Sequence, residues 1–350
     1  MVATKLFRLA IFAMSLPAST PPCLGCGATA LKALYRANAF DTDQQATFTL
    51  ARCTQCDLVR TEPVLTEQQL GPYYAAPYYG DGQRKFTGIV ERFTRFDNWR
   101  RARRLLALFR AAQPALAGQE SRPWRILDIG CGRANLLAAL ARQGCECHGV
   151  ERQEFPLEPA YSNIRFYRGK LEDLPLTAGY FDVIILWHVL EHVNNPALTL
   201  GTVEKLLQPG GILALAVPNF GSWQSVLFKS AWFHLDLPRH IHHFSRSALE
   251  NLLGIHHLQS FKSSTWAFDQ NVFGFVQSIL NRLWPKNHAN ELYALLKKSK
   301  QSSANSRLLG WLTIACFIAP FALLEYLLSG LVKRGATLII YAKKTNNPEY

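Results

Sequence analysis

Acidic residues and cysteines are both scarce in this chain, and each shortage narrows what the protein can be. Its 350 residues include 25 Asp and Glu against 38 Lys and Arg, which gives a formal net charge of +13. An acidic, solvating chain is excluded, and anionic partners are favoured: nucleic acid, phosphorylated metabolites or an acidic membrane face. The eight cysteines do not form the dense pattern of a disulfide framework, so we expect a reducing, cytoplasmic compartment.

The sequence also lacks internal repeats and a disordered composition. Hydrophobic residues make up 49% of it and charged residues 18%, which is typical of one good-sized α/β domain with smaller attachments. The first residues, 1–22, carry Lys5 and Arg8 before a short apolar run. We interpret this stretch as a disordered leader or a start-site artefact rather than a secretion signal, because export would oxidise the paired cysteines that follow it.

From Arg125 onward, short apolar runs alternate with helical segments. The predicted strands are 125–131, 147–152, 164–168, 181–187 and 212–217, and the predicted helices between them include 135–143 and 196–207. Strands that alternate with helices indicate a parallel, doubly wound sheet. The fold class is therefore α/β.

A glycine-rich turn follows the first of these strands and reads Leu127-Asp-Ile-Gly-Cys-Gly-Arg-Ala-Asn135. Glycines there let the backbone approach a ligand, with the next helix N-terminus pointing at it. Glu151 ends the second strand, where a carboxylate can bind both hydroxyls of a ribose. A dinucleotide is disfavoured, because Asn135 replaces the last glycine of G-x-G-x-x-G. Asp128 would also repel a pyrophosphate, whereas it suits an amino group and a sulfonium.

Several motifs follow the glycine turn in a fixed order. They are Glu151, Leu171-Glu-Asp-Leu-Pro175, Phe181-Asp-Val-Ile184 and Leu190-Glu-His192. This run resembles the class I S-adenosylmethionine-dependent methyltransferases over about 125–219. The resemblance implies a Rossmann-like, seven-stranded sheet with an antiparallel last strand, and the β-rich run at 336–342 suits that role.

The same resemblance implies how S-adenosylmethionine would be held. Asp128, Gly130 and Gly132 would line its methionine part, and Glu151 its ribose. Leu171 and Glu172 would lie beside the adenine, while Trp187 and His188 would close the pocket. Two residues depart from the family pattern: Ala134 replaces a third glycine, and Lys170 stands where relatives often place an aspartate near the adenine.

Four of the cysteines form two C-x-x-C pairs, Cys23-Leu-Gly-Cys26 and Cys53-Thr-Gln-Cys56. Each pair can present two thiolates to the same point, so together they predict a closed, tetrahedral Zn²⁺ site. Four protein ligands leave no open coordination position, and the zinc is therefore expected to be structural. A metal-free pair of redox motifs is the alternative, without thioredoxin-like surroundings to support it.

A histidine-rich segment, 234–245, follows the strand predicted at 212–217, where methyltransferases of this class place acceptor-binding residues. A base with a near-neutral pKa is what a methyl acceptor needs before it attacks. His240 and His243 are therefore our candidate catalytic residues. Ordinary hydrogen-bonded structure and a second metal site that includes Asp236 are the alternatives. In an extended segment, His240 and His242 would share one side.

The succession of zinc module, Tyr-rich linker, core and histidine segment resembles the nucleotide-sugar C-methyltransferases. Aligned on Phe244-Ser245, the Glu-His pair of that family falls on Arg239-His240. The histidine matches, while the arginine could hold a phosphate or carboxylate. The resemblance implies methyl transfer to a small or lipid-linked acceptor of anionic or sugar type, with His240 as base. An RNA methyltransferase and a non-catalytic binding protein on the cofactor fold are the alternatives.

The whole chain is expected to divide into four parts. These are a leader (1–22), a zinc module (23–63), a Tyr-rich linker with a basic helix (64–120), and the methyltransferase domain (121–350) with a helical insertion at about 270–331 and a final strand at 336–342. Within the insertion, 309–331 is long enough to span a bilayer. The next strand must return to the sheet, so we expect a buried or interfacial helix and, as its partner, the inner membrane face.

Overall fold

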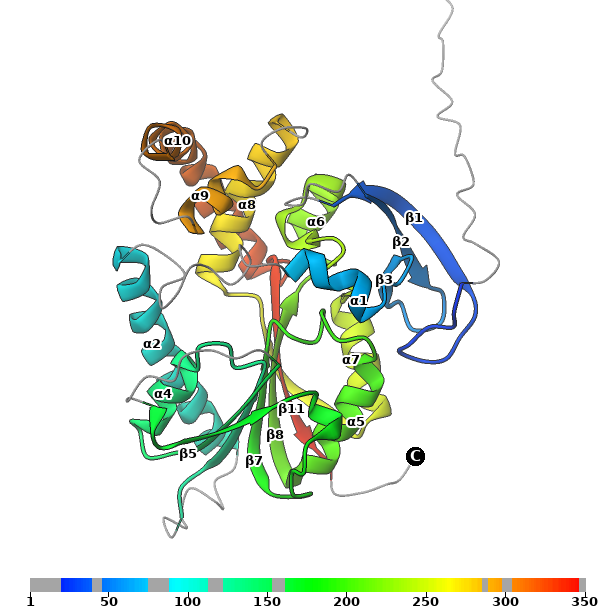
Figure 1. Ribbon diagram of the computed structural model, residues 1–350, viewed down its shortest axis with the longest axis vertical. Coiled ribbons are helices and arrows are strands. Elements are labelled where there is room, and N and C mark those ends of the chain that lie inside the picture. Colours follow the sequence, from blue (N-terminus) through cyan, green and yellow to red (C-terminus); the bar gives the residue numbers. More distant parts are fainter. Residues whose placement is uncertain are drawn as a thin grey trace, which may run out of the picture.

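Two β-sheets organise the protein, one of seven strands and one of four (Figure 1). The computed structural model describes residues 20–39, 46–74, 88–112, 122–152, 161–284, 289–297 and 304–345. Most of the predicted leader, residues 1–19, lies outside the described residues, as does part of the Tyr-rich linker, 75–87.

The seven-stranded sheet has the order β10-β11-β8-β7-β4-β5-β6. Its strands are β4 (Arg125–Ile129), β5 (Glu146–Glu151), β6 (Ile164–Arg168), β7 (Phe181–Trp187), β8 (Leu207–Pro218), β10 (Leu258–Ser264) and β11 (Thr337–Lys344). The strands from β6 to β8 are mutually parallel, whereas β11 is antiparallel to both of its neighbours, β8 and β10. The predicted Rossmann-like sheet with an antiparallel last strand is confirmed.

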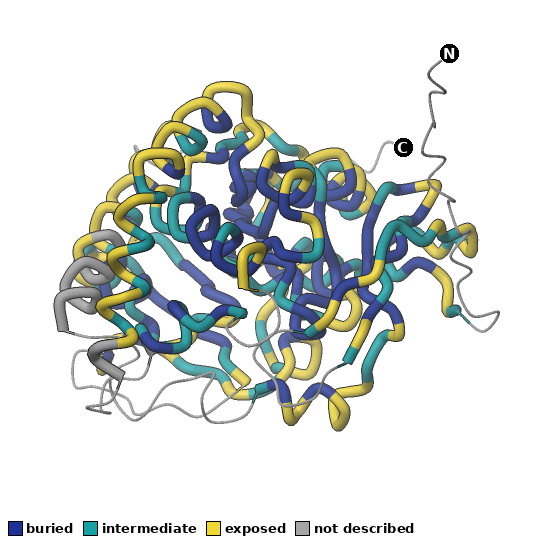
Figure 2. Tube along the Cα trace, turned by 90° about the horizontal axis from the view of Figure 1, so that it is seen from above, coloured by how far each residue is buried: buried dark blue, intermediate teal, exposed yellow. Residues whose placement is uncertain are grey.

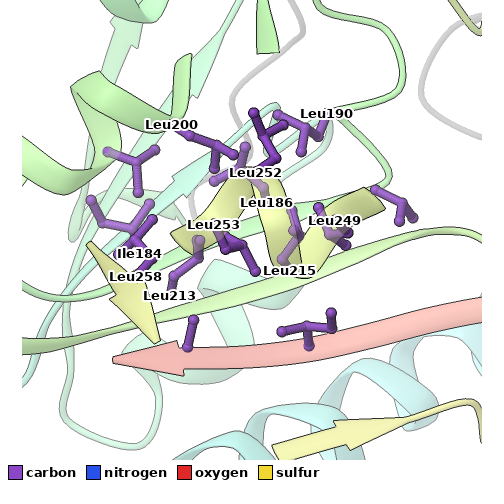
Figure 3. Packing of buried hydrophobic residues seen from close by; sticks show 14 of the residues in the cluster. Ile184, Leu186, Leu190, Leu200, Leu213, Leu215, Leu249, Leu252, Leu253 and Leu258 are labelled. Carbon is purple, nitrogen blue, oxygen red and sulfur yellow. The ribbon is translucent and has the colours of Figure 1, made fainter. Parts of the chain in front are cut away.

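Helices cover both faces of this sheet, which is why its central strands are apolar throughout. On one face, α5 (Pro196–Leu206) and α7 (Arg246–Ile255) bury their leucines against β7 and β8, as the labelled side chains in Figure 3 show. On the other, α2 (Gly88–Ala112) and α4 (Asn135–Ala141) form a second cluster around Phe109 and Leu137. Burial is therefore deepest along the sheet, between the helical layers (Figure 2).

The second sheet joins the N-terminal module to the main domain. It contains β1 (Leu31–Asn38), β2 (Thr47–Cys53), β3 (Val59–Glu62) and, from far along the chain, β9 (His242–His243). Strand β3 pairs with β9, so the histidine segment is held by the module. Arg60 in β3 donates hydrogen bonds to the carbonyl oxygens of Pro21 and Pro22, which precede the first cysteine pair. These two residues are therefore attached to β3 of the module.

The helical insertion consists of α8 (Phe268–Leu283), α9 (Glu291–Lys297) and α10 (Ala304–Leu331). It packs with α6 (Trp223–Phe228), η5 (Lys229–Ala231) and η6 (Phe233–Leu235) in a third apolar cluster, which also includes Phe48 and Leu50 of the N-terminal module. Figure 1 shows these helices beyond the end of the sheet at which β8 and β7 finish. The insertion thus lies close to the edge where the predicted site residues gather.

Candidate active site

The glycine turn connects β4 to α4 and requires left-handed backbone at several positions. Gly130 has φ of +68° and Gly132 of +50°, a conformation that side chains with a Cβ rarely adopt. A Cβ on Gly130 would lie 2.5 Å from Cγ2 of Val189, whereas one on Gly132 would meet nothing within 4 Å. Ala134 also takes a positive φ, +54°. The turn can therefore approach a ligand closely, and Gly130 can be replaced only with local rearrangement.

A cavity of about 200 Å³ opens at this turn. Of the predicted cofactor residues, Asp128, Gly130 and Trp187 line it. The others that line it are Asn98, Arg101, Cys131, Arg133, Asn135 and Leu136. The contribution of α2 was not predicted from the sequence, which indicated only a basic helix there. The guanidinium of Arg101 on this helix lies 4.4 Å from the centre of the Trp187 ring. The cavity thus has a cationic group beside its acidic one.

The carboxyl group of Asp128 is buried at the base of this cavity. Burial, followed by the nearby charge of Glu151, raises the pKa of Asp128 to about 8 despite the opposing effect of Arg101. The Glu151 carboxylate accepts a hydrogen bond of 2.9 Å from the backbone N–H of Gly132, which places it at the mouth of the turn. A ligand carrying both an ammonium and a carboxylate would find a complementary partner for each.

The other predicted cofactor residues occupy different surroundings. Leu171, in η4 (Leu171–Asp173), is buried in the core cluster between the sheet and α5. Glu172 accepts a hydrogen bond of 2.7 Å from the Thr199 hydroxyl on α5. Neither lines the cavity. His188, directly after β7, has a positive φ of +57°, an unfavourable conformation of the kind found at functional sites.

The first part of the Tyr-rich linker covers the same sheet edge, which the sequence did not predict. It forms α1 (Glu67–Leu70) and η1 (Gly71–Tyr74). The Glu67 carboxylate contacts Arg152 at 3.0 Å and Lys170 at 2.9 Å, at the ends of β5 and β6. Lys170, the departure from the family pattern, is thus paired with an acidic residue from outside the matched region. Nothing in the local sequence around Glu67 could have indicated this contact.

A histidine cluster surrounds a buried carboxylate just after β7, the strand that ends at Trp187. Glu191 and His192 follow β7, and His240 approaches them from the segment before β9, with its ring centre 4.6 Å from that of His192. Burial raises the pKa of Glu191, but its hydrogen bond with His188 and the other neighbouring histidines lower it, so the net shift is downward. Burial also lowers the pKa of His192 to about 4. This imidazole is therefore neutral at ordinary pH.

Arg239 is not exposed to an incoming anion. Its guanidinium is 5% exposed, donates several hydrogen bonds to the carboxylate of Asp236, and donates another of 3.3 Å to the carbonyl of Tyr73. Burial raises the pKa of Asp236, yet the adjacent Arg239 and His240 charges bring it below its usual range. The pair is therefore an ion pair at ordinary pH. It ties the histidine segment to η1.

His240 and His243 occupy different environments. His240 approaches Glu191 and His192, whereas His243 is buried against the N-terminal module, where its Nε2 lies 3.0 Å from the hydroxyl of Thr61. Burial lowers the pKa of His243 well below its ordinary value. His242 faces the opposite way, with Nε2 3.3 Å from the carbonyl of Asn194. These contacts favour a structural role for His243 and leave His240, beside Glu191 and His192, as the remaining candidate.

The four predicted zinc ligands lie together. Cys23 and Cys56 have their sulfur atoms 3.6 Å apart, and Cys26 and Cys53 likewise. All four sulfurs lie within 4.8 Å of one another. A tetrahedral zinc with bonds of about 2.3 Å places its sulfurs about 3.8 Å apart. The hydrogen bond from Cys56 is the largest cause that lowers the pKa of Cys23 to about 5. The donor set therefore fits Zn²⁺.

The outer surface of α10 is unusual because its exposed side chains are apolar. Residues 307–331 form the one described helix that is long and apolar enough to cross a membrane. Phe317 is 76% exposed and Phe321 65%. Glu325 faces the domain instead, where its carboxylate accepts a 2.9 Å hydrogen bond from Gln224. This distribution is the reverse of that on an ordinary surface helix.

The mixed seven-stranded sheet is the fold of class I methyltransferases. The family model described as a methyltransferase domain matches residues 95–256. Residues 95–256 therefore match a methyltransferase domain, as the motifs predicted.

The chain is also similar to curated relatives called ubiquinone biosynthesis O-methyltransferase. The one from Psychrobacter arcticus is 33% identical over 120 residues, which cover 31% of this chain and 45% of that protein. The one from Histophilus somni is 29% identical over 136 residues, covering 35% of this chain and 57% of that protein. The chain thus spans about half the length of the curated relatives it matches.

Among solved structures, a sarcosine dimethylglycine methyltransferase of Galdieria sulphuraria aligns with a TM-score of 0.42 at 13% identity, covering 69% of this chain and 86% of that one. The Burkholderia thailandensis 1,6-didemethyltoxoflavin-N1-methyltransferase, bound to its acceptor and S-adenosylhomocysteine, aligns with a TM-score of 0.39 at 16% identity. This alignment covers 89% of this chain and 100% of the Burkholderia protein.

Proposed function

We propose that the protein transfers the methyl group of S-adenosylmethionine to a hydroxyl of a small, lipid-linked acceptor. The observation that carries this proposal is the juxtaposition of two sites at one sheet edge. The glycine-turn cavity offers Asp128 and Arg101, and the cluster of Glu191, His192 and His240 follows β7 beside it. In parallel α/β sheets, ligands bind at the carboxyl ends of the strands.

The cavity residues suit the methionine part of the donor. Asp128 would bind the α-ammonium and Arg101 the α-carboxylate, while Gly130 leaves room for the chain between them. Glu151, already at the mouth of the turn, would exchange its contact with Gly132 for the ribose hydroxyls. The adenine would then lie toward Leu171 and Glu172, next to Lys170 and Glu67.

The acceptor would occupy the histidine side. His240 is the side chain best suited to take the proton from the attacking hydroxyl. An oxygen lone pair would then form the bond to the methyl carbon, and the carbon–sulfur bond would break with its electron pair going to sulfur. The names of the O-methyltransferase relatives favour oxygen as the acceptor atom. Arg239, already paired with Asp236, gives less support to an anionic or sugar acceptor.

The apolar surface of α10 favours a lipid-linked acceptor and contact with an anionic membrane surface. Arg307, at one end of this helix, contacts Glu291 at 3.6 Å, and near the other end Glu325 is held by Gln224. Because both ends are fixed to one domain, the helix suits lying on a membrane better than crossing it. The exposed Lys333 that follows it and the +13 net charge complement anionic lipid. A cytoplasmic enzyme at the inner membrane face would fit these features.

The four-cysteine site is proposed to bind one structural Zn²⁺. Its place in the protein gives it an indirect role in the reaction. Strand β3 begins three residues after Cys56 and pairs with β9, so zinc would stabilise the segment that carries His240. No ligand position is left for a substrate.

One assay separates the classes of acceptor. The zinc-loaded protein would be incubated with methyl-labelled S-adenosylmethionine and, in parallel, with the lipid extract, the aqueous metabolites and the RNA of the source cells. We expect label in the lipid extract. Transfer to RNA or to aqueous metabolites alone would overturn the lipid-linked acceptor, and binding of the donor without turnover in any fraction would favour a non-catalytic binding protein.

Membrane contact is tested separately with vesicles. Phe317→Glu and Phe321→Glu together should reduce sedimentation with anionic vesicles by about tenfold or more, because each places a charge where lipid is expected. Leu198→Glu, which alters an exposed leucine of α5, is the matched control and should bind as the wild type does. Equal binding of all three proteins would contradict the assignment of this surface.

A further inference from the structure

The cluster formed by Glu191, His192 and His240 has a geometry that goes beyond a single base. Each residue offers one ligand atom, and the three atoms lie within 4.8 Å of one another. Two backbone hydrogen bonds hold the contributing segments together: the N–H groups of Ile241 and His242 donate to the Glu191 carbonyl at 2.8 and 3.2 Å. The cluster is therefore built by the fold rather than by chance rotamers.

The hydrogen bonds of both histidines fall on the same ring nitrogen. Nδ1 of His192 lies 3.0 Å from the Arg239 carbonyl, and Nδ1 of His240 lies 2.9 Å from the His234 carbonyl. A carbonyl only accepts, so each Nδ1 carries a proton, and Nε2 is the ring nitrogen left for a ligand. Metal-binding histidines are oriented in this way, with the other ring nitrogen donating to a carbonyl or carboxylate.

Two polar atoms beside the histidines are buried without a hydrogen-bond partner among the described residues. They are Oε2 of Glu191 and Nε2 of His188. Oε1 of Glu191 is already engaged, 3.3 Å from Nδ1 of His188. Glu191 itself is 1% exposed, and a buried, unpaired carboxylate oxygen is costly. A cation would remove that cost.

We propose that Glu191, His192 and His240 bind a divalent transition-metal cation beside the cofactor cavity. Two imidazoles and one carboxylate favour Mn²⁺, Fe²⁺ or Zn²⁺ over Mg²⁺, which prefers oxygen ligands. Bonds of about 2.1 Å bring ligand atoms within about 4.2 Å of one another, so the side chains close slightly on binding. The adjacent His188 and Asp236 can support the ligands.

This inference rests on the proposed function and refines the role of His240. The cation would coordinate the acceptor hydroxyl and lower its pKa. The proton then passes to solvent, the oxygen forms its bond to the methyl carbon, and the carbon–sulfur bond breaks with its electron pair going to sulfur. His240 thereby acts through the cation instead of accepting the proton itself.

The test uses the full-length, zinc-loaded protein and Mn²⁺, whose free form is measured by electron paramagnetic resonance. Thiolate sites prefer Zn²⁺, so Mn²⁺ reports on the second site. We expect one Mn²⁺ per chain and about tenfold or more weaker binding in Glu191→Gln and in His240→Ala. His257→Ala, which removes an exposed histidine in the turn after α7, is the control and should bind Mn²⁺ as the wild type does.

Donor binding is measured in the same samples to show that each variant is folded. Absence of Mn²⁺ binding by the wild type, or equal binding by all variants, overturns the inference. If His240→Ala still lowers turnover in that case, the proposed function stands with His240 as the base. If Mn²⁺ binds as expected and no acceptor is methylated, the proposed function fails and the metal site remains.

Discussion

The two halves of the candidate active site are assembled in different ways. The cofactor side comes mostly from one continuous stretch, in which the turn after β4 and Glu151 at the end of β5 belong to a single β–α–β unit. The acceptor side is made from η1, the loop after β7 and the segment before β9. These meet only through tertiary contacts, such as that of the Tyr74 hydroxyl with Nδ1 of His192 at 3.1 Å. Donor binding on the cofactor side should therefore be lost only through substitutions near the glycine turn. Turnover, which depends on the acceptor side, should also respond to substitutions far from it.

The largest effect is expected from His240→Ala. Loss of a general base, or of a ligand that activates the acceptor, typically costs about 10²–10⁴-fold in turnover. Affinity for S-adenosylmethionine should hardly change, because His240 does not line the cavity in which the donor is expected. Steady-state kinetics together with calorimetry would measure both quantities. Full activity in the variant would show that the histidine cluster is structural.

Gly130→Val should have the next largest effect, on the cofactor side. The new side chain meets Val189 and requires φ of +68°, and such overpacking with backbone strain costs about 3 kcal/mol, or about 100-fold in donor affinity. Gly132→Ala shares the positive φ without the clash and should lose far less. Equal losses in the two variants would mean that Val189 does not restrict the turn.

Removal of the zinc should affect the acceptor side of the site and leave the cofactor side almost unchanged. Because β3 pairs with β9, Cys53→Ser should lower turnover by about tenfold or more while donor affinity stays within about threefold of the wild type. Metal analysis would confirm that zinc is lost, and hydrogen exchange would show where protection falls. Loss of donor binding to the same extent as turnover would contradict the separate assembly of the two halves.

A smaller effect concerns pH. The pKa of Asp128 is about 8 in the ligand-free protein, so its carboxyl group is mostly protonated at about pH 7. The donor ammonium favours the carboxylate, so binding lowers this pKa and releases a proton. Affinity should therefore rise with pH, by up to about tenfold per unit between about pH 6 and about pH 8, and level off above the ligand-free pKa. Asp128→Asn should bind weakly and without this dependence, as calorimetry in several buffers would show.

The same difference in assembly explains how far the sequence could be interpreted. The individual strands of the parallel part, the glycine turn and the cysteine pairs were predictable because each depends on short-range pattern, whereas the seven-stranded sheet was implied by the family resemblance. Arg101 was not identified, because its helix shows many arginines and only packing selects the one beside Trp187. Glu67 was missed for a similar reason, since its partners are distant in the chain. His243 resembled a second catalytic histidine until its pairing with β3 placed it against Thr61.

The central claim is that the turn from Asp128 to Gly132 binds S-adenosylmethionine, and calorimetric titration of the purified protein with the donor tests it most directly. We expect one site per chain in the wild type and affinity reduced by about tenfold or more in Asp128→Ala, because the ammonium loses its charged partner. No heat and no thermal shift from the folded, zinc-loaded wild type would contradict the account.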